Sequence, residues 1–420
     1  MEDKLIHEPT KIKDNNNNNL KFEEEEQKEI VLNFDNCNNL EIKQDDQEKN
    51  EDQKIKEENQ PTKEIKRKRN YGIDLLRIIS MFFVCLLHTL FRGGILDEVK
   101  IKSTNYFFAW FLEISAFCAV DSYALISGYV GVSSKCRLAN FAYLWLQVEF
   151  YSLGILFVSA IIKQEMFTGG DFYEHVFPIT KEKFWYFSAY LGLYIVMPYL
   201  NFSLNNMPKN VVKWNLIIGL PIIMIFSRLN DNFIYLLRGY SSFWLIILYI
   251  VGGYIKKYEP FKKVKKLYLI LLWIICIVIT WVVKISIEIS TESPGSGDIL
   301  ISYLSITIFT TAIILLELFS RITFNKNPKI IQILSVSSFG AFLIHTHTAS
   351  WDWLNKRFVS FSYYNPILFL LATLGIALTI YIICSIIDYL RYLLFELIKV
   401  KTFLLKLEEK FNKKFIDIAT

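Results

Sequence analysis

Two ionisable side chains, Arg77 and His88, lie in the apolar segment 71–92 with ten residues between them. Ionisable groups inside a membrane span are costly, so they usually face the protein interior and mark a functional path. At about 100° per residue, both side chains fall on nearly the same helix face. They are then about 16 Å apart along the axis, at about 1.5 Å per residue. A guanidinium suits phosphate and an imidazole suits proton or acyl transfer, so this pair is the first candidate site.

His345 is the second candidate imidazole. Counted from the predicted starts of their spans, His88 and His345 reach a similar depth, in the half of the membrane away from Arg77. Two histidines at one depth can line a common cavity. The alternative is that each imidazole only forms a hydrogen bond between helices. His347 is expected at the outer interface, in contact with water.

Arg77 allows two interpretations of equal weight. Because it lies near the start of its span, its long side chain can reach back to lipid phosphates. It can instead bind an anionic substrate. The next span carries Asp121 at a similar depth, and an Arg77–Asp121 ion pair would neutralise two costly charges.

The second span ends in Ser127, Gly128 and Tyr129. A glycine there would let the backbone approach a ligand closely, but a small residue for helix packing is an equal alternative. We consider these three residues, together with Asp121 and His345, as candidate substrate-binding residues. The aromatic run 184–187 is most simply an interfacial belt.

The composition divides the chain into two parts. Residues 1–70 carry 14 Lys+Arg and 19 Asp+Glu with an asparagine run, whereas residues 71–420 carry 32 and 22. The first part is too polar to bury a core, and we predict a disordered acidic, Asn-rich cytosolic tail. The basic excess of the second part belongs to membrane loops and does not imply nucleic acid. The six cysteines lack paired spacing, which argues against a metal site or a disulfide framework.

Apolar stretches of about 20 residues recur through the second part and predict an all-α polytopic membrane protein with about ten transmembrane helices. The predicted spans are 72–92, 106–130, 138–162, 184–206, 212–228, 242–256, 267–287, 299–320, 331–350 and 366–390. Lysine and arginine gather at 66–69 and in the loop 256–266, so both termini are predicted to be cytosolic. Residues 393–420 alternate apolar and charged positions and predict an amphipathic cytosolic helix.

Several ordered sequence blocks give the chain a family resemblance over roughly residues 70–390. They are Arg77 with His88, the motif Leu125-Ile-Ser-Gly-Tyr129, the segment 184–201, and Phe339-Gly-Ala-Phe-Leu-Ile-His345. In this order they resemble the acyltransferase 3 family of integral membrane O-acyltransferases, so residues 71–392 are interpreted as its transmembrane domain.

The resemblance implies transfer of an acyl group, usually acetyl, from cytosolic acyl-CoA to a hydroxyl of a saccharide or related acceptor on the opposite side. It implies no tightly bound cofactor and no metal, with acyl-CoA, the acceptor and the lipid bilayer as partners. His88 would act as the general base or accept the acyl group itself, and Arg77 would hold the CoA phosphates or orient the thioester. His345 would assist from across the cavity. The acceptor, the membrane and the oligomeric state stay open.

The chain departs from the family pattern in places. Asp121 stands where related sequences often carry Asn, and the basic segment at 135–137 is short. The acidic leader lies outside the pattern, and no hydrolase-like domain is expected after the membrane part. The main alternative function is a secondary transporter that uses intramembrane Arg, His and Asp for coupling, which would favour paired broken helices in both halves.

Overall fold

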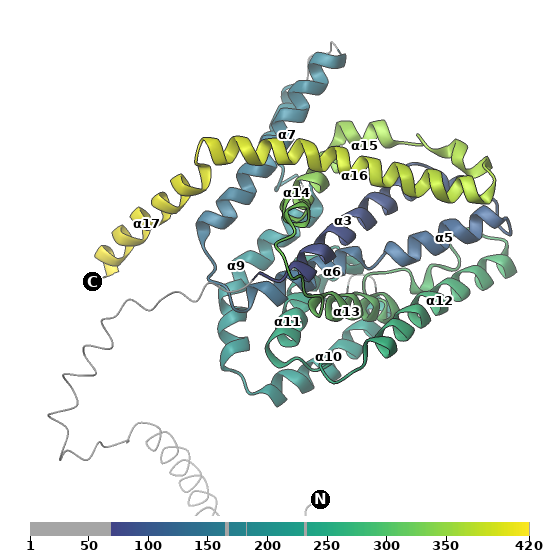
Figure 1. Ribbon diagram of the computed structural model, residues 1–420, viewed down its shortest axis with the longest axis horizontal. Coiled ribbons are helices and arrows are strands. Elements are labelled where there is room, and N and C mark those ends of the chain that lie inside the picture. Colours follow the sequence, from purple (N-terminus) through teal and green to yellow (C-terminus); the bar gives the residue numbers. More distant parts are fainter. Residues whose placement is uncertain (1–68, 164–167, 182, 231–232, 420) are drawn as a thin grey trace, which may run out of the picture. The chain divides into compact units, whose positions relative to one another are not determined.

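The computed structural model describes residues 69–163, 168–181, 183–230 and 233–419. The predicted disordered tail therefore lies almost wholly outside the described residues. Within them the chain is all-α, with no β-strand. With the labels of Figure 1, the helices of the first half are α3 (Tyr71–Phe91), α4 (Ile95–Glu98), α5 (Thr104–Ala116), α6 (Ala119–Gly131), α7 (Leu138–Lys163), α8 (Gly169–Val176), α9 (Trp185–Asn206) and α10 (Lys209–Leu229). Those of the second half are α11 (Ser242–Tyr258), α12 (Lys266–Thr291), α13 (Ile306–Ser320), α14 (Lys329–Thr346), α15 (Thr348–Leu354), α16 (Pro366–Leu397) and α17 (Val400–Ala419).

Each predicted membrane span contains a helix. In the part of the chain that the structure describes, eight spans are long and apolar enough to cross a bilayer, and α5 and α6 together form one of them. The short 3₁₀ turns at 233–239 and α11 together form a further candidate span, bent by 79°, and α13 is a shorter apolar helix of 15 residues. The chain is thus a polytopic membrane protein, as predicted.

Several predicted spans are interrupted where irregular backbone replaces helix. The second span breaks at Phe117 and Cys118, between α5 and α6. Just before and after this break, the hydroxyls of Ser115 and Ser122 donate to backbone carbonyls four residues earlier, a pattern that bends helices. The predicted span at 299 has a 3₁₀ turn at Asp298–Leu300 and becomes α-helical only at Ile306. Non-helical backbone at membrane depth is tolerated where it is buried in protein or lines a cavity.

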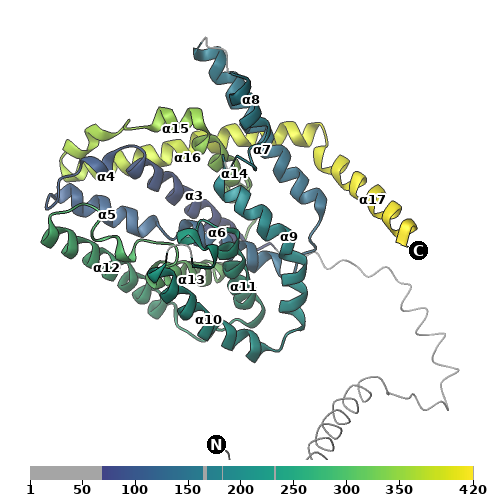
Figure 2. The same cartoon turned by 180° about the vertical axis from the view of Figure 1, so that it is seen from behind.

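α3 is the helix around which the others pack. It contacts α14 and α16 on one side and α5, α6 and α13 on the other, and it runs through the middle of the bundle in both views (Figures 1 and 2). Because the spans alternate in direction, the start of α3 and the ends of α11 and α13 lie at the same end of the bundle. There the Asn70 amide donates to the Ser320 carbonyl, and Arg321 donates to Val264 in the lysine-rich loop. The basic loops that predict the cytosolic side therefore share one end.

The most extensive helix contact joins α6 and α11, and glycines make it possible. A Cβ atom on Gly128 would lie 2.0 Å from the Tyr249 carbonyl oxygen, and one on Gly252 would lie 2.1 Å from that of Leu125. Small residues at a membrane helix interface allow the backbones to approach closely. Of the two roles considered for Gly128, its surroundings match helix packing, since the backbone of α11 and no cavity lies beside it.

The C-terminal helix α17 begins at Val400, after α16 has continued to Leu397. α17 extends away from the end of α16 (Figure 1) and contacts α7, where the Leu138 amide donates to Glu408. The separate helix thus begins later than position 393, and its amphipathic cytosolic placement stays a prediction.

The glycine packing gives a stability prediction. We expect Gly128→Ala to lower the melting temperature of the purified protein, because the new methyl group meets the α11 backbone. The cost should be about 1–3 kcal/mol, as for other overpacked interiors. Gly154→Ala in α7 is the matched control, since no atom lies within 4 Å of its added Cβ. Equal melting temperatures for the two variants, measured by fluorescence-detected size exclusion after heating, would contradict this account of the α6–α11 contact.

Candidate active site

The structure brings His88 and His345 together from α3 and α14. His88 Nδ1 lies 2.9 Å from His345 Nε2, which is hydrogen-bonding distance, and the ring centroids are 5.0 Å apart. His345 is buried, whereas His88 is partly exposed to the space beside it. The two histidines are therefore adjacent, as their similar predicted depth suggested, but of the two only His88 is among the residues that line the cavity beside them. That they share a catalytic role stays a prediction.

The hydrogen bonds assign the ring protons of the neutral pair. His345 Nδ1 lies 2.6 Å from the Ala341 carbonyl oxygen, which can only accept, so Nδ1 carries the proton. A neutral His345 then accepts at Nε2 from the His88 Nδ1–H group. This leaves the lone pair of His88 on Nε2, which has no hydrogen-bond partner among the described residues. The arrangement leaves a basic nitrogen free to take a proton from a ligand.

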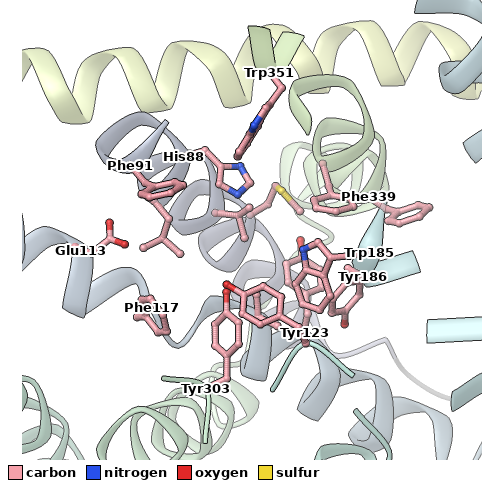
Figure 3. A pocket seen from close by; sticks show the side chains of 16 residues that line it. His88, Phe91, Glu113, Phe117, Tyr123, Trp185, Tyr186, Tyr303, Phe339 and Trp351 are labelled. Atoms are coloured by element: carbon pink, nitrogen blue, oxygen red, sulfur yellow. The ribbon is translucent and has the colours of Figure 1, made fainter. Parts of the chain in front are cut away.

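His88 lines a cavity of about 440 Å³ between α3, α5, α6, α9 and α14. Figure 3 places its ring at the wall, below Trp351, with Phe117 and Glu113 on one side and Trp185, Tyr186 and Phe339 on the other. Trp351 packs edge-on against the His88 ring at 4.8 Å. The volume is in the range of small-molecule binding sites, and most of the lining is aromatic or aliphatic.

Arg77 lies in a second cavity of about 260 Å³, near the start of α3. Its guanidinium donates to Asp74 Oδ1 at 2.8 Å, and the Ser335 hydroxyl donates to the same oxygen. Arg69 reaches the other carboxylate oxygen at 2.5 Å. The side chain therefore points into protein rather than back to lipid. It is held on one side by Asp74 and remains 29% exposed toward the cavity.

The predicted Arg77–Asp121 pair is absent, and that prediction is wrong. Asp121 is fully buried and accepts a hydrogen bond from Trp244 Nε1 at 3.0 Å, facing α11. It lies in the first turn of α6, where the helix dipole favours a negative charge. The prediction failed because a new helix starts after the break at Phe117 and Cys118. The helix face on which Asp121 lies therefore cannot be counted from the beginning of the span.

The two cavities share a wall. Tyr123, Tyr186 and Phe339 line both of them, so three aromatic rings separate the Arg77 cavity from the His88 cavity. Tyr123 is fixed there by donating to the Arg77 carbonyl oxygen at 2.8 Å. Arg77 and His88 therefore reach two adjoining cavities along one helix.

The remaining candidate residues divide by position. Ser127 lines the Arg77 cavity and donates to the Tyr123 carbonyl. Gly128 packs on α11 as described above. Tyr129 carries the Lys256 ammonium over its ring at 4.8 Å. Neither Tyr129 nor Asp121 is among the residues that line the two cavities.

Some functional positions were missed or misread in the sequence. Trp185 and Tyr186 line the His88 cavity, so the run 184–187 is more than an interfacial belt. His347, expected in contact with water, is buried and lies within hydrogen-bonding distance of the Ser152 carbonyl oxygen. Its burial places α15, and with it Trp351, over the cavity. The aromatic density of the run was a usable signal, whereas nothing in the sequence indicated the fold-back of α15.

Comparison with known proteins then decides the family. A family model described as an acyltransferase domain, Acyl_transf_3, matches residues 70–387. The chain belongs to the acyltransferase 3 family. No curated protein and no solved structure matches it. Membership in this acyltransferase family makes the chain a membrane acyltransferase, and the matched range contains the described helices that line one or both cavities.

No group of three His, Cys, Asp or Glu side chains is arranged to hold a metal ion in the part of the chain that the structure describes. The polar groups of the two cavities are instead imidazole, guanidinium, carboxylate and hydroxyl. These groups suit acid–base chemistry and anion binding.

The histidine pair gives a positional prediction. We expect His345→Ala to lower kcat for acyl transfer about tenfold, because His88 loses the hydrogen bond that orients its ring and fixes its tautomer. The KM for the acyl donor should stay unchanged. His345→Gln should restore part of the rate, since its amide oxygen can accept from His88 Nδ1–H. A His345→Ala enzyme with normal kcat, or one altered only in KM, would contradict this role.

Proposed function

We propose that the protein moves an acyl group, most simply acetyl, from acyl-CoA in the Arg77 cavity to a saccharide hydroxyl in the His88 cavity. The observation that carries the proposal is the pair of adjoining cavities on α3, one lined by arginine and the other by the free imidazole nitrogen of His88. Family membership supplies acyl transfer as the reaction, and the residues of each cavity suggest what binds there.

The Arg77 cavity suits the donor. Arg69 and Arg77 both line it, together with hydroxyl groups of Ser127 and Ser335. A guanidinium binds phosphate with fork geometry, and CoA carries several phosphates. The gathering of basic loops at this end of the bundle predicts that it faces the cytosol, where acyl-CoA is available.

The distance between the two sites suits the flexible arm of CoA. Arg77 and His88 are about 16 Å apart along α3, at about 1.5 Å per residue, which is comparable with an extended pantetheine arm. With the phosphates near Arg77, the arm would pass between Tyr123, Tyr186 and Phe339 to bring the thioester carbonyl into the His88 cavity. The three rings would exclude water from that path.

His88 is assigned the role of the general base. The acceptor hydroxyl oxygen attacks the thioester carbonyl carbon while His88 Nε2 takes the hydroxyl proton. The C–S bond breaks, the proton passes from His88 to the departing thiolate, and CoA leaves as the free thiol with the ester on the acceptor. Direct attack by His88 Nε2 on the thioester, followed by transfer from an acyl-histidine, uses the same free nitrogen. Rapid quench with labelled acyl-CoA in the absence of acceptor distinguishes the two routes.

The first test is removal of the base. We expect His88→Ala to reduce transfer from radiolabelled acetyl-CoA by about 10²- to 10⁴-fold, the usual contribution of a positioned acid–base group. The melting temperature should stay close to that of the wild type, because His88 is only partly buried. Full activity in a folded His88→Ala protein would end the proposal. Uptake of a solute into proteoliposomes without acyl-CoA would favour the transporter instead.

The second test concerns the donor. We expect Arg77→Gln to raise the KM for acetyl-CoA about tenfold or more, as one charge-assisted hydrogen bond is lost. The matched control is Arg228→Gln, which removes an exposed arginine at the end of α10. An unchanged KM in Arg77→Gln, measured by release of free CoA thiol, would show that the guanidinium does not hold the donor.

A further inference from the structure

Glu113 is a carboxylate in the His88 cavity that the proposed chemistry does not use. It lies on α5, lines the cavity on the side opposite Tyr186 and Phe339 in Figure 3, and is only 7% exposed. Its Oε2 atom is buried and has no hydrogen-bond partner among the described residues. A buried polar oxygen without a partner is costly, and in a native protein it calls for an explanation.

The neighbouring cation does not pair with Glu113. Lys284 is fully buried, and its ammonium is bound to Glu288 at 2.5 Å and to Asp298, and lies 3.5 Å from the centre of the Trp110 ring. The Tyr106 hydroxyl also donates to Glu288 rather than to Glu113. The groups that could have neutralised Glu113 are therefore already engaged with one another, and its carboxylate is left facing the cavity.

The rest of the cavity lining decides what kind of ligand would use this carboxylate. Among the residues that the structure describes, no lysine or arginine lines the cavity, so an anionic ligand would meet Glu113 without a compensating charge. The walls are rich in aromatic rings, among them Phe117, Trp185, Tyr186, Tyr240, Tyr303 and Trp351. Flat rings pack against the apolar C–H faces of a sugar, and a carboxylate accepts hydrogen bonds from its hydroxyls.

We propose that Glu113 binds a hydroxyl of the acceptor and makes the His88 cavity selective for neutral sugars over those that carry a carboxylate or phosphate. This inference rests on the proposed function, because it assigns the ligand of the same cavity. A sugar hydroxyl beside Glu113 donates to its carboxylate, the aromatic walls hold the sugar ring, and a second hydroxyl is directed to His88 Nε2. An anionic sugar is rejected by charge repulsion in a water-poor site.

The test uses two matched probes and the full chain in lipid nanodiscs. The probes are octyl β-glucoside and octyl β-glucuronide below their micelle concentrations, which differ in one carboxylate. Transfer of label from acetyl-CoA to each sugar is measured alongside release of free CoA. The variants are Glu113→Gln, which keeps the size and removes the charge, and Glu113→Ala. The matched control is Glu149→Gln in α7, where the carboxylate binds Trp145 and does not line the cavity.

The wild type and Glu149→Gln should acylate the glucoside at least tenfold faster than the glucuronide. In Glu113→Gln the ratio of the glucoside rate to the glucuronide rate should fall about tenfold, because the glucuronide is acylated faster than by the wild type. Glu113→Ala should raise the KM for the glucoside about tenfold or more, as expected for one hydrogen bond to a charged group. The control Glu149→Gln should release CoA without added sugar at the wild-type rate, because Glu149 does not line the cavity.

Two results would overturn the inference while leaving the proposed function in place. One is an unchanged preference and glucoside KM in both Glu113 variants. The other is CoA release by the wild type with transfer to neither sugar, or with equal transfer to both. Absence of any CoA release from the wild type would instead contradict the proposed function, and the inference with it.

Discussion

The cost of placing an ionisable group in an apolar surrounding constrains this molecule more than any other interaction. Most buried charges are neutralised within their own helix, by a partner three or four residues away. Such pairs are Asp74–Arg77, Lys284–Glu288, Glu317–Arg321 and Asp388–Arg391. Each pair also fixes a helix against its neighbours. Asp388, for example, accepts from Gln147 and Tyr151 of α7.

Among the groups outside these pairs, Asp121 is buried against Trp244, whereas His88 and Glu113 face the His88 cavity. His88 keeps Nε2 free because its Nδ1–H group donates to His345 Nε2. The Nδ1 proton of His345 is already donated to the Ala341 carbonyl of its own helix, so a neutral His345 can only accept from His88. Glu113 keeps a free oxygen because the nearby lysine is already paired. Arg77 is paired and yet partly exposed to its cavity. A ligand or water that completes the incompletely satisfied groups of the cavity would lower their cost, and this links the energetics of the fold to the site.

Much of the architecture could be predicted from the sequence, because membrane spans follow from length and hydropathy alone. The regions that could not be predicted are those where the helix is irregular. The break at Phe117, the non-helical segment before Ile306, and the fold-back of α15 each carry an aromatic side chain into the His88 cavity. Local composition does not reveal such breaks, since the interrupted backbone is satisfied by other helices. The same break turned Asp121 toward Trp244 and removed the expected ion pair with Arg77.

The sequence by itself determined the spans, the family resemblance and the common face of Arg77 and His88, because helical periodicity relates residues on one helix. Only the tertiary structure decided which partners those residues have. Asp74 rather than Asp121 pairs with Arg77, His345 lies within hydrogen-bonding distance of His88, and Glu113 Oε2 has no hydrogen-bond partner in the described part of the chain. The physical reason is that these contacts depend on the rotation and crossing of separate helices. Those are set by packing, such as the approach of α6 to α11 at Gly128, and not by any local preference of the chain.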